Sequence, residues 1–492
     1  MSATYYLAVD LGAESGRVML GTLQEGRVSL EEIHRFPSRV LTVNGHSHWD
    51  LKSLEKEIFT GIEKAAARNV AISGISADSW GVDYVLLDAK GHALGDPYCY
   101  RDSRTADSPG RLFKKMPFAE IYHETGIQFM VINTIYHFEA QQHEDPSVFA
   151  NADHFLNIAD YFNSRFCGVE TSEQSLASTT QLYNPKNQAW SEKLISTLGL
   201  KKSLFPKIVS SGTVLGPVNG ALKNYPSLAG ARAVATCSHD TGAAVAAVPA
   251  TGGNWAYLSS GTWSLLGAEL PQPVLTDIAC QAGFTNEVGL GGKIRFLKNL
   301  AGLWVLQECR RAWEAAGQSF TYDDLTKLAV ENGPATAHFS LNDARFLTAG
   351  DMPNKISAYC RETGQPVPTT PGQFVRTILE SLALTYAQTL RTLESLIGHK
   401  IEKLHIVGGG SRSQLLNQLT ADATGLPVTA GPIEATAIGN ILIQALALGH
   451  LESAAHLRRI VADSFSTETY QPGSAFSDEI RTRFQKLPPC NS

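Results

Sequence analysis

Two stretches of the sequence combine the residue types that hold phosphate groups. Residues 10–17 (DLGAESGR) follow an apolar run, so their turn can offer backbone N–H groups to a phosphate while Asp10 holds Mg²⁺ through water. Residues 259–262 (SSGT) repeat the pattern with hydroxyl groups in place of the acid. Residues 10–17 also fit an ordinary hairpin whose glycines only permit the turn, and the residues leave both interpretations open.

A third stretch, residues 408–411 (GGGS), follows an apolar run and precedes a predicted helix at 414–423. Because its glycines have no side chains, a purine or a ribose can approach the backbone closely. A purely structural turn is the alternative. The sequence has neither a GxxxxGK[ST] loop nor a GxGxxG turn after a strand, which disfavours P-loop and Rossmann nucleotide sites.

Asp240 stands at the predicted start of a helix of small residues, in the stretch 238–242 (SHDTG). One interpretation is structural, because Ser, Asp and Thr are typical N-cap residues. The other is chemical, because a carboxylate beside a helix N-terminus stays ionised and can accept a proton from a substrate hydroxyl. Asp240 therefore has the right chemistry for a general base.

Residues 78–83 (DSWGVD) end a predicted strand, and residues 100–104 (YRDSR), with two arginines, lie shortly downstream. The ring of Trp80 beside Asp83 and Arg101 suits a polyol, whose C–H faces pack on aromatic rings and whose hydroxyls bond to charged groups. Trp80 equally fits a buried core, and Arg101 fits a surface ion pair. Asn299 either contacts a ligand or caps the helical run that follows it.

The elements that position these residues alternate between strands and helices. Apolar and β-branched runs predict strands at residues 5–9, 17–22 and 27–36. Residues 23–26 (LQEG) predict a hairpin between the last two strands, because Gly26 supplies the positive φ of a tight turn. Apolar residues at three-to-four spacing then predict an amphipathic helix over 51–67, and strand character returns at 70–79. This order of elements indicates an α/β fold.

A short internal echo indicates two related halves, because residues 8–21 and 256–267 both run from a strand through a Gly/Ser turn into a second strand. Between the halves, residues 248–254 are rich in Pro and Gly and uncharged, as in a linker. We therefore expect two domains, 1–250 and 251–492. The second half also contains a predicted long helix and a predicted buried strand, at 373–397 and 404–407.

The composition of the 492 residues narrows the function classes. Hydrophobic residues at 43% and charged residues at 18% are typical of a globular protein, and a net charge of -6 disfavours nucleic acid as a partner. Seven scattered cysteines without a CxxC pair predict neither a disulfide framework nor a zinc ribbon. We expect a cytoplasmic protein, with neither an export signal nor a membrane span, that is a monomer or a small homo-oligomer.

Taken in order, these motifs resemble the FGGY family of carbohydrate kinases. The resemblance rests on residues 10–12, 238–241, 259–262, 408–411 and 434–440 (EATAIGN), and it spans nearly the whole chain. It implies the actin-like, hexokinase-like fold of two related ribonuclease-H-type α/β domains flanking a catalytic cleft. It also implies that the domains close on the sugar, which excludes water and limits ATP hydrolysis.

Residues 78–83, 100–105 and 297–304 are most similar to the branch of the family that phosphorylates L-rhamnulose at its C1 hydroxyl. The resemblance implies ATP and Mg²⁺ as cofactors, Asp240 as the base and Asp10 near the ion. It implies ATP contacts at Ala13, Glu14, Ser15, Gly16, Arg17, Thr262, Gln307, Gly408, Gly409 and Gly410. It implies sugar contacts at Gly81, His239, Asp240, Thr241 and Asn299. The branch often has two small residues where this chain has Ala13 and Glu14, so a role for the Glu14 side chain is open.

Other interpretations keep part of this pattern. An FGGY kinase for L-fuculose or xylulose would share the chemistry and differ only in its sugar contacts. A nucleotide-gated sugar sensor or chaperone-like switch would keep the fold without turnover, but the acid at position 240 and the lack of an added binding segment disfavour it. A filament protein of actin type would leave the sugar residues without a purpose.

Overall fold

The computed structural model describes residues 3–341 and 343–487, and its contacts divide the chain into two compact units. Unit 1 contains the described residues of Met1–Pro249, Glu269–Phe296 and Glu434–Phe465. Unit 2 contains those of Ala250–Ala268, Leu297–Ile433 and Ser466–Ser492. The chain first passes from unit 1 to unit 2 inside the predicted linker, between Pro249 and Ala250. Two later segments, Glu269–Phe296 and Glu434–Phe465, belong to unit 1 again. The predicted ranges 1–250 and 251–492 therefore match the two units only at this first boundary.

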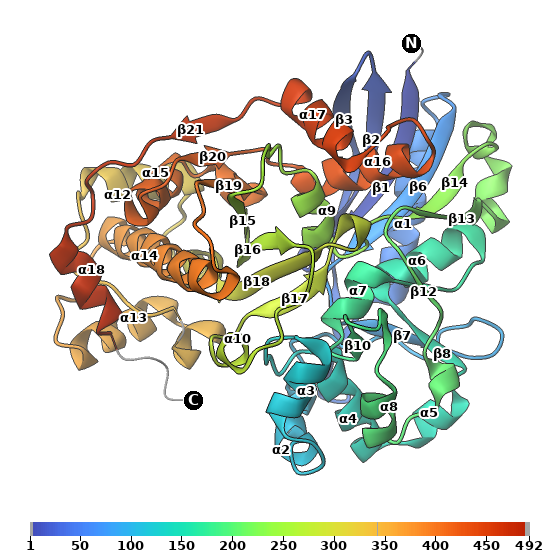
Figure 1. Cartoon of the computed structure of the whole chain (residues 1–492), viewed down its shortest axis with the longest axis horizontal. Coiled ribbons are helices and arrows are strands. Elements are labelled where there is room, and N and C mark those ends of the chain that lie inside the picture. The colour runs from blue at the N-terminus through green and yellow to red at the C-terminus, as the bar shows by residue number, and fades with distance from the viewer. Residues whose placement is uncertain (1–2, 342, 488–492) are drawn as a thin grey trace. The chain divides into compact units, whose positions relative to one another are not determined.

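The main sheet of unit 1 has the strand order β13-β14-β6-β1-β2-β3 (Figure 1). The strands β1 (Thr4–Leu11), β2 (Ser15–Gln24) and β3 (Arg27–Pro37) are antiparallel neighbours, as the sequence predicted. The β2–β3 turn has positive φ at Glu25 (52°) and Gly26 (74°), which matches the twist of a tight hairpin. The sheet is completed by β6 (Ile72–Ser79) parallel to β1, β14 (Arg232–Ala235) parallel to β6, and β13 (Thr213–Pro217) antiparallel to β14.

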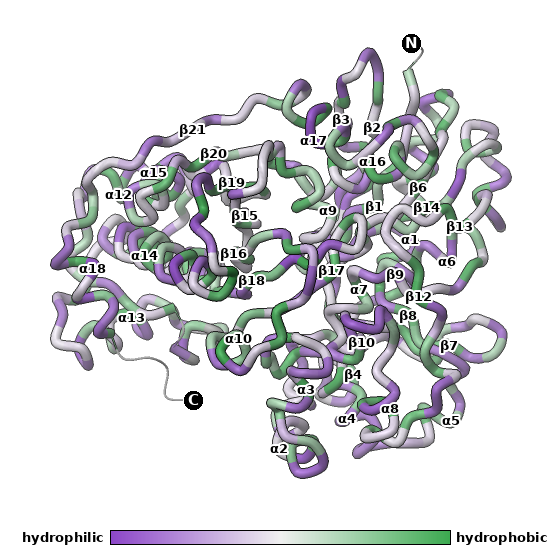
Figure 2. Tube along the Cα trace, viewed as in Figure 1, coloured by the Kyte–Doolittle hydropathy of each residue, from purple (hydrophilic) through white to green (hydrophobic). Residues whose placement is uncertain are grey.

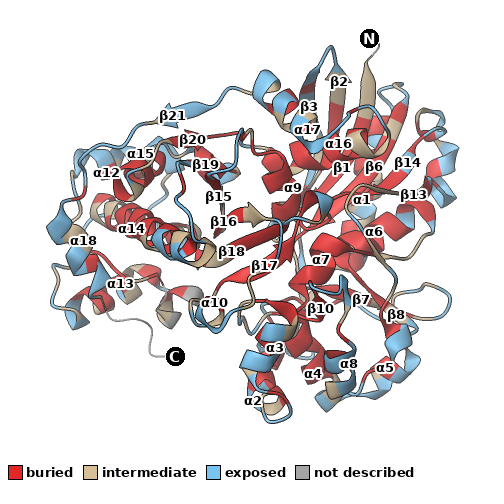
Figure 3. Ribbon diagram, in the orientation of Figure 1, coloured by how far each residue is buried: buried red, intermediate tan, exposed pale blue. Residues whose placement is uncertain are grey.

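Helices cover both faces of this sheet. A Cβ atom on Gly21 would lie 2.5 Å from Ile441 of α16 (Ala435–Ala447), so the missing side chain lets α16 approach closely. On the opposite face, Gly61 of α1 (Leu51–Ala66) makes the same kind of contact with Val18. Because both faces are covered, β1 is an almost continuous buried run, seen in red in Figure 3.

Unit 1 also contains shorter strands and further helices outside its main sheet. Some of the apolar residues between Tyr84 and Phe205 form a second apolar cluster, in which Tyr84, Phe138 and Phe155 meet edge to face. The elements are β4 (Val40–Val43), β5 (His46–Trp49), β7 (Tyr84–Leu87), α2 (Ser108–Leu112), α3 (Phe118–Thr125), α4 (Thr134–Glu144), α5 (Ser147–Asn151), β8 (His154–Asn157), α6 (Ile158–Cys167), β9 (Ser172–Glu173), α7 (Gln174–Thr179), β10 (Tyr183–Asn184), β11 (Ala189–Trp190), α8 (Glu192–Thr197), β12 (Ile208–Val209), α9 (Asp240–Ala246), α10 (Asp277–Gln281), β17 (Thr285–Val288) and α17 (Ala454–Ser464).

Unit 2 repeats the arrangement of β2, β1 and β6 around a strand of its own. The strand β15 (Trp255–Ser260) pairs antiparallel with β16 (Trp263–Leu270) and parallel with β19 (Lys403–Val407). The sequence echo falls on these matching elements. The sheet also contains β18 (Ile294–Ala301) beside β16, β20 (Val428–Ala430) beside β19, and β21 (Glu468–Tyr470) at its edge.

The longest helix of unit 2 is α14 (Pro371–Ile397), which confirms the predicted helix and begins two residues earlier. The Thr370 hydroxyl accepts a hydrogen bond from the N–H of Gln373, and Gly398 ends the helix with a φ of 77°. The other helices of the unit are α11 (Trp304–Ala315), α12 (Tyr322–Glu331), α13 (Met352–Glu362), α15 (Gln414–Thr424) and α18 (Asp478–Gln485).

Hydrophobic residues concentrate in the elements that are buried rather than in one long segment. Figure 2 shows α9 and α16 as largely hydrophobic, in accord with their buried residues. Among residues 3–341 and 343–487, no helix is both long and apolar enough to span a bilayer.

The six described cysteines are free thiols, and Cys490 lies outside the described residues.

Candidate active site

Three acidic residues of unit 1 meet at the carboxyl ends of β1 and β6. Asp10 and Asp78 are register partners on these parallel strands, so their side chains leave the sheet on the same face. The N–H of Ser79 donates to the carbonyl of Ser238, which brings the start of α9 beside the end of β6. Asp240 is the first residue of α9, and its charge acts on Asp78.

Burial and mutual repulsion raise the proton affinity of Asp78 and Asp240. Burial raises the pKa of the Asp78 carboxyl well above its usual value, and the charges of Asp10 and Asp240 add to the effect. Asn440 of α16 donates to Asp78 Oδ2 at 2.5 Å, which opposes the shift. Burial also raises the pKa of Asp240, and the hydrogen bonds from Thr241 oppose this shift. A carboxyl with a raised pKa is better suited to accept a proton.

Arg17 supplies the compensating positive charge. Its guanidinium group donates to the carboxylates of Asp10 and Glu434, and its side chain is 17% exposed. Burial alone would lower the pKa of Arg17, but the two carboxylates raise it above its usual value, so the group stays charged. Arg17 therefore links the strands β1 and β2 to Glu434, the residue that precedes α16.

The turn between β1 and β2 is a hairpin, one of the two interpretations of residues 10–17. Its Gly12 N–H donates to the Ser15 carbonyl at 3.1 Å, and the Ser38 hydroxyl donates to the Gly12 carbonyl at 2.7 Å. A Cβ on Gly16 would lie 2.4 Å from the Phe36 ring, so glycine is needed here for packing. Glu14 is exposed, whereas Ala13 and Ser15 are half-buried. Phosphate binding by this turn stays a prediction.

The first turn of α9 shows that Asp240 is not an N-cap. His239 occupies the N-cap position and makes no side-chain capping bond, while Asp240 is the first helical residue. Asp240 Oδ1 accepts hydrogen bonds from the N–H of Thr241 at 2.5 Å and from its hydroxyl at 3.1 Å. These bonds fix the carboxylate with both donors on one oxygen.

Two buried residues that the sequence did not single out contact His239. Arg295 Nη2 lies 3.0 Å from His239 Nδ1, and Glu287 Oε2 lies 3.2 Å from the same nitrogen. Burial would raise the pKa of Glu287, but the neighbouring charge of Arg295 lowers it, and the pKa lies below its usual value. No spacing rule connects residues 239, 287 and 295, because strands and a helix distant in sequence bring them together.

Trp80 and Asp83 are buried and hydrogen-bonded to each other. The indole N–H groups of Trp49 and Trp80 both donate to Asp83 Oδ2, at 2.6 and 2.8 Å. Burial raises the pKa of Asp83 to about 7 although these donors oppose the shift. The structure thus places Trp80 in the core of unit 1, as the alternative interpretation predicted, and its sugar contact stays a prediction.

The other two sugar candidates of this region lie nearer the surface. A Cβ on Gly81 would lie 3.0 Å from the Thr179 hydroxyl, so a larger residue would press on α7. Arg101 is exposed, with its guanidinium carbon 5.2 Å from the centre of the Tyr100 ring. Their sugar contacts also stay predictions.

The nucleotide candidates of unit 2 gather at the carboxyl ends of β15 and β19. The Gln307 amide donates to the Thr262 hydroxyl at 3.4 Å. Gly408 has a φ of 86°, and a Cβ on Gly410 would lie 2.0 Å from Ser260 Oγ, so the loop packs against the end of β15 through its glycines. Gly409 has no atom within 4 Å of an ideal Cβ.

Asn299 does not cap the helix that follows it. It lies inside β18, whereas α11 begins at Trp304 with Leu303 in the N-cap position. The capping interpretation of Asn299 is therefore wrong, and its ligand contact stays a prediction.

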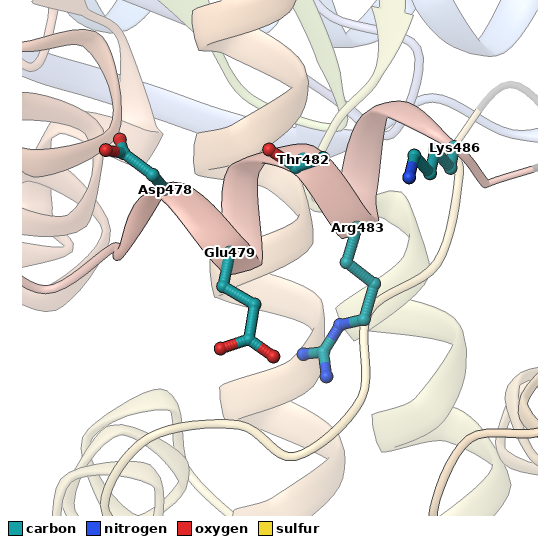
Figure 4. A pocket seen from close by; sticks show the side chains of 5 residues that line it. All are labelled: Asp478, Glu479, Thr482, Arg483 and Lys486. Atoms are coloured by element: carbon teal, nitrogen blue, oxygen red, sulfur yellow. The ribbon is translucent and has the colours of Figure 1, made fainter.

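The helix α18 of unit 2 carries a surface hollow. It is lined by Asp478, Glu479, Thr482, Arg483 and Lys486, and none of the predicted site residues is among them. Glu479 and Arg483, one helical turn apart, point to the same side (Figure 4). An exposed face of this kind is typical of a solvated helix rather than a site.

Residues 5–247 and 256–448 match the N-terminal and C-terminal domains of the FGGY family of carbohydrate kinases. The chain belongs to this family. It is 42% identical to a rhamnulokinase of Bacteroides thetaiotaomicron over 95% of this chain and 96% of the relative. It is 41% identical to a rhamnulokinase of Enterococcus faecalis over 98% and 96% of the respective lengths.

The fold of FGGY kinases is also present in solved structures. A ligand-bound xylulose kinase from Lactobacillus acidophilus gives a TM-score of 0.79 over 98% of this chain and 96% of that one, at 17% identity. This similarity confirms the predicted fold class of two α/β domains. As a member of a carbohydrate kinase family, the chain has a sugar and ATP as its small-molecule reactants.

Proposed function

We propose that this protein is an ATP-dependent kinase that phosphorylates the C1 hydroxyl of L-rhamnulose, giving L-rhamnulose 1-phosphate and ADP in L-rhamnose catabolism. Rhamnulokinases that are about 40% identical over nearly the full length support the substrate. The observation that carries the chemistry is the Asp240 carboxyl, held at the start of α9 with a raised pKa.

In this proposal Asp240 is the general base. Thr241 donates two hydrogen bonds to Asp240 Oδ1, so the carboxylate has one orientation before the sugar binds. Asp240 accepts the proton of the C1 hydroxyl as the oxygen attacks the γ-phosphorus of ATP. Phosphoryl transfer asks little covalent chemistry of a protein, so positioning of the two reactants carries most of the rate.

The remaining predicted residues divide between the reactants. Ala13, Glu14, Ser15, Gly16 and Arg17 of unit 1, and Thr262, Gln307, Gly408, Gly409 and Gly410 of unit 2, bind ATP. Gly81, His239, Thr241 and Asn299 contact the sugar, with Trp80, Asp83 and Arg101 shaping the same region. Neutral and charged donors of this kind can orient several hydroxyl groups at once.

Mg²⁺ is part of the same proposal, with Asp10 as its nearest protein group through water. Within residues 3–341 and 343–487, no group of three His, Cys, Asp or Glu side chains is placed to hold an ion. This fits Mg²⁺, which takes one or two carboxylates and otherwise binds phosphates and water. When bound, the ion neutralises charge on the transferred phosphoryl group.

The experiment is a coupled ADP-release assay of the purified protein with Mg·ATP. The sugar panel contains L-rhamnulose, L-fuculose, D- and L-xylulose, D- and L-ribulose, and glycerol. We expect strong selectivity for L-rhamnulose and a roughly 10²- to 10⁴-fold fall in turnover for Asp240→Asn, which keeps the size and the acceptor oxygen. Asp463→Asn, at an exposed position of α17, is the matched control.

Each other outcome has a distinct meaning. Selectivity for another polyol would overturn the substrate and leave the kinase chemistry in place. Near-normal turnover of Asp240→Asn would remove Asp240 as the base. Intact ATP binding without sugar-stimulated turnover would favour a nucleotide-gated sensor over an enzyme.

A further inference from the structure

In unit 1, a buried ion pair contacts the Nδ1 atom of His239. Arg295 on β18 is 0% exposed and Glu287 on β17 is 5% exposed, and Arg295 Nη2 lies 3.1 Å from Glu287 Oε2. Both groups face the same ring nitrogen, His239 Nδ1. His239 is only 8% exposed, so these two groups make up most of what surrounds its Nδ1 atom.

The neighbouring backbone makes room for the guanidinium group. A Cβ on Gly289 would lie 3.1 Å from Arg295 Cγ, and a Cβ on Gly242 of α9 would lie 3.5 Å from Arg295 Nη2. Arg295 Nε donates to the Val288 carbonyl at 3.2 Å. Burying such a pair yields little stability compared with apolar residues of the same volume, so stability alone does not explain it.

The chemistry of the three groups determines where the imidazole proton lies. Arg295 Nη2, 3.0 Å from Nδ1, can only donate a hydrogen bond, whereas Glu287 Oε2, 3.2 Å from the same nitrogen, can only accept one. The guanidinium group is the nearer of the two, which favours Nδ1 as an acceptor. A neutral imidazole that accepts at Nδ1 carries its proton on Nε2. Glu287 balances the charge of Arg295, so this arrangement needs no net charge in the interior.

The proton on Nε2 points toward the reacting centre. His239 Nε2 lies 3.5 Å from Asp240 Oδ1, on the side of the ring opposite the ion pair. An N–H donor beside the base can bind an oxygen of the sugar that neighbours the hydroxyl which Asp240 deprotonates. For a ketose phosphorylated at C1, that neighbour is the C2 oxygen.

We infer that Glu287 and Arg295 are a positioning pair that fixes His239 in its Nε2–H form, so that His239 donates a hydrogen bond to the C2 oxygen of a 2-ketose. The inference rests on the proposed function for the identity of the acceptor. It assigns the pair a role in sugar binding, whereas neither residue contacts the sugar itself.

The test combines ¹⁵N NMR of the histidine side chains of the full chain with steady-state kinetics. The His239 signals are identified by their loss in His239→Gln. We expect the wild type to show the Nε2–H form. In Arg295→Met, Nδ1 loses its donor and instead donates to Glu287, so the tautomer should switch, and the KM for the sugar should rise about 10-fold or more while the KM for ATP stays within about 2-fold.

Two further variants separate positioning from mere packing. Glu287→Gln keeps Arg295 as the donor, so the Nε2–H form should persist with a smaller rise in the sugar KM. In the double variant Glu287→Gln/Arg295→Met, the side-chain amide introduced at position 287 can donate to Nδ1 in place of the guanidinium group. We therefore expect the double variant to restore the tautomer and recover most of the sugar KM.

Three results would overturn the inference. They are an Nδ1–H form in the wild type, an unchanged tautomer in folded Arg295→Met, and a double variant no better than Arg295→Met. The wild-type spectrum decides the first point even if Arg295→Met does not fold. The NMR measurement needs no substrate, so the tautomer is tested separately from the proposed function, which the sugar panel and Asp240→Asn test.

Discussion

Substitution of Gly439 by alanine should disturb stability and catalysis together. Gly439 lies in α16 at its contact with α9, two helices that Figure 1 draws side by side. A Cβ on Gly439 would lie 1.9 Å from the carbonyl oxygen of Ala243 and 2.6 Å from its carbonyl carbon. These are backbone atoms, so no rotamer change can relieve the overlap.

The size of the effect follows from this overlap. To bring the Cβ contact with the Ala243 oxygen to 3.0 Å, the helices must separate by about 1 Å at this point. Overpacking of this kind costs about 1–3 kcal/mol of unfolding free energy. Ala243 lies one turn from Asp240, so the base should move as well, and a displacement of about 1 Å can lower turnover about 100-fold.

The measurements are urea unfolding and the sugar-dependent ADP-release assay. Gly110→Ala is the matched control, because Gly110 is also helical in unit 1 and an ideal Cβ there meets no atom within 4 Å. The control should be neutral or slightly more stable. If Gly439→Ala were as stable and as active as Gly110→Ala, the close contact between α16 and α9 would not exist as described.

Two further predictions concern buried polar groups. Because burial raises the pKa of Asp83 to about 7, the folded protein binds this proton more tightly than the unfolded chain, so the unfolding free energy should fall as the pH rises from about 4 to 7. Asp83→Asn should flatten that slope in urea unfolding at several pH values, and an unchanged slope would assign it to other groups. In unit 2, Tyr386→Phe removes the 2.7 Å hydrogen bond between the Tyr386 hydroxyl and Ser264, and should lower the unfolding free energy by about 1–2 kcal/mol. Tyr322→Phe, at a side chain 45% exposed, should change it little, and equal effects of the two would contradict the burial argument.

Local features of the sequence were enough to predict the elements that follow simple periodicity. The hairpin of β2 and β3, the helix α1 and the long helix α14 each have a clear apolar pattern and a turn or cap residue at their ends. Asn299 shows the limit of this reasoning. Its position before a helical run is compatible with a helix cap, but strand pairing extends β18 past it, and pairing partners distant in sequence are not visible in a local pattern.

The sequence by itself determined the family, the fold class and the acid at position 240, because short motifs in a fixed order carry that information. Only the tertiary structure placed Glu287 and Arg295 behind His239, and Asp78 beside Asp10 under the amide of Asn440. Burial gives these contacts their large effect on pKa values, because charges removed from water interact more strongly with their neighbours. Burial and distant neighbours are properties of the packed chain, so no local stretch of sequence contains them.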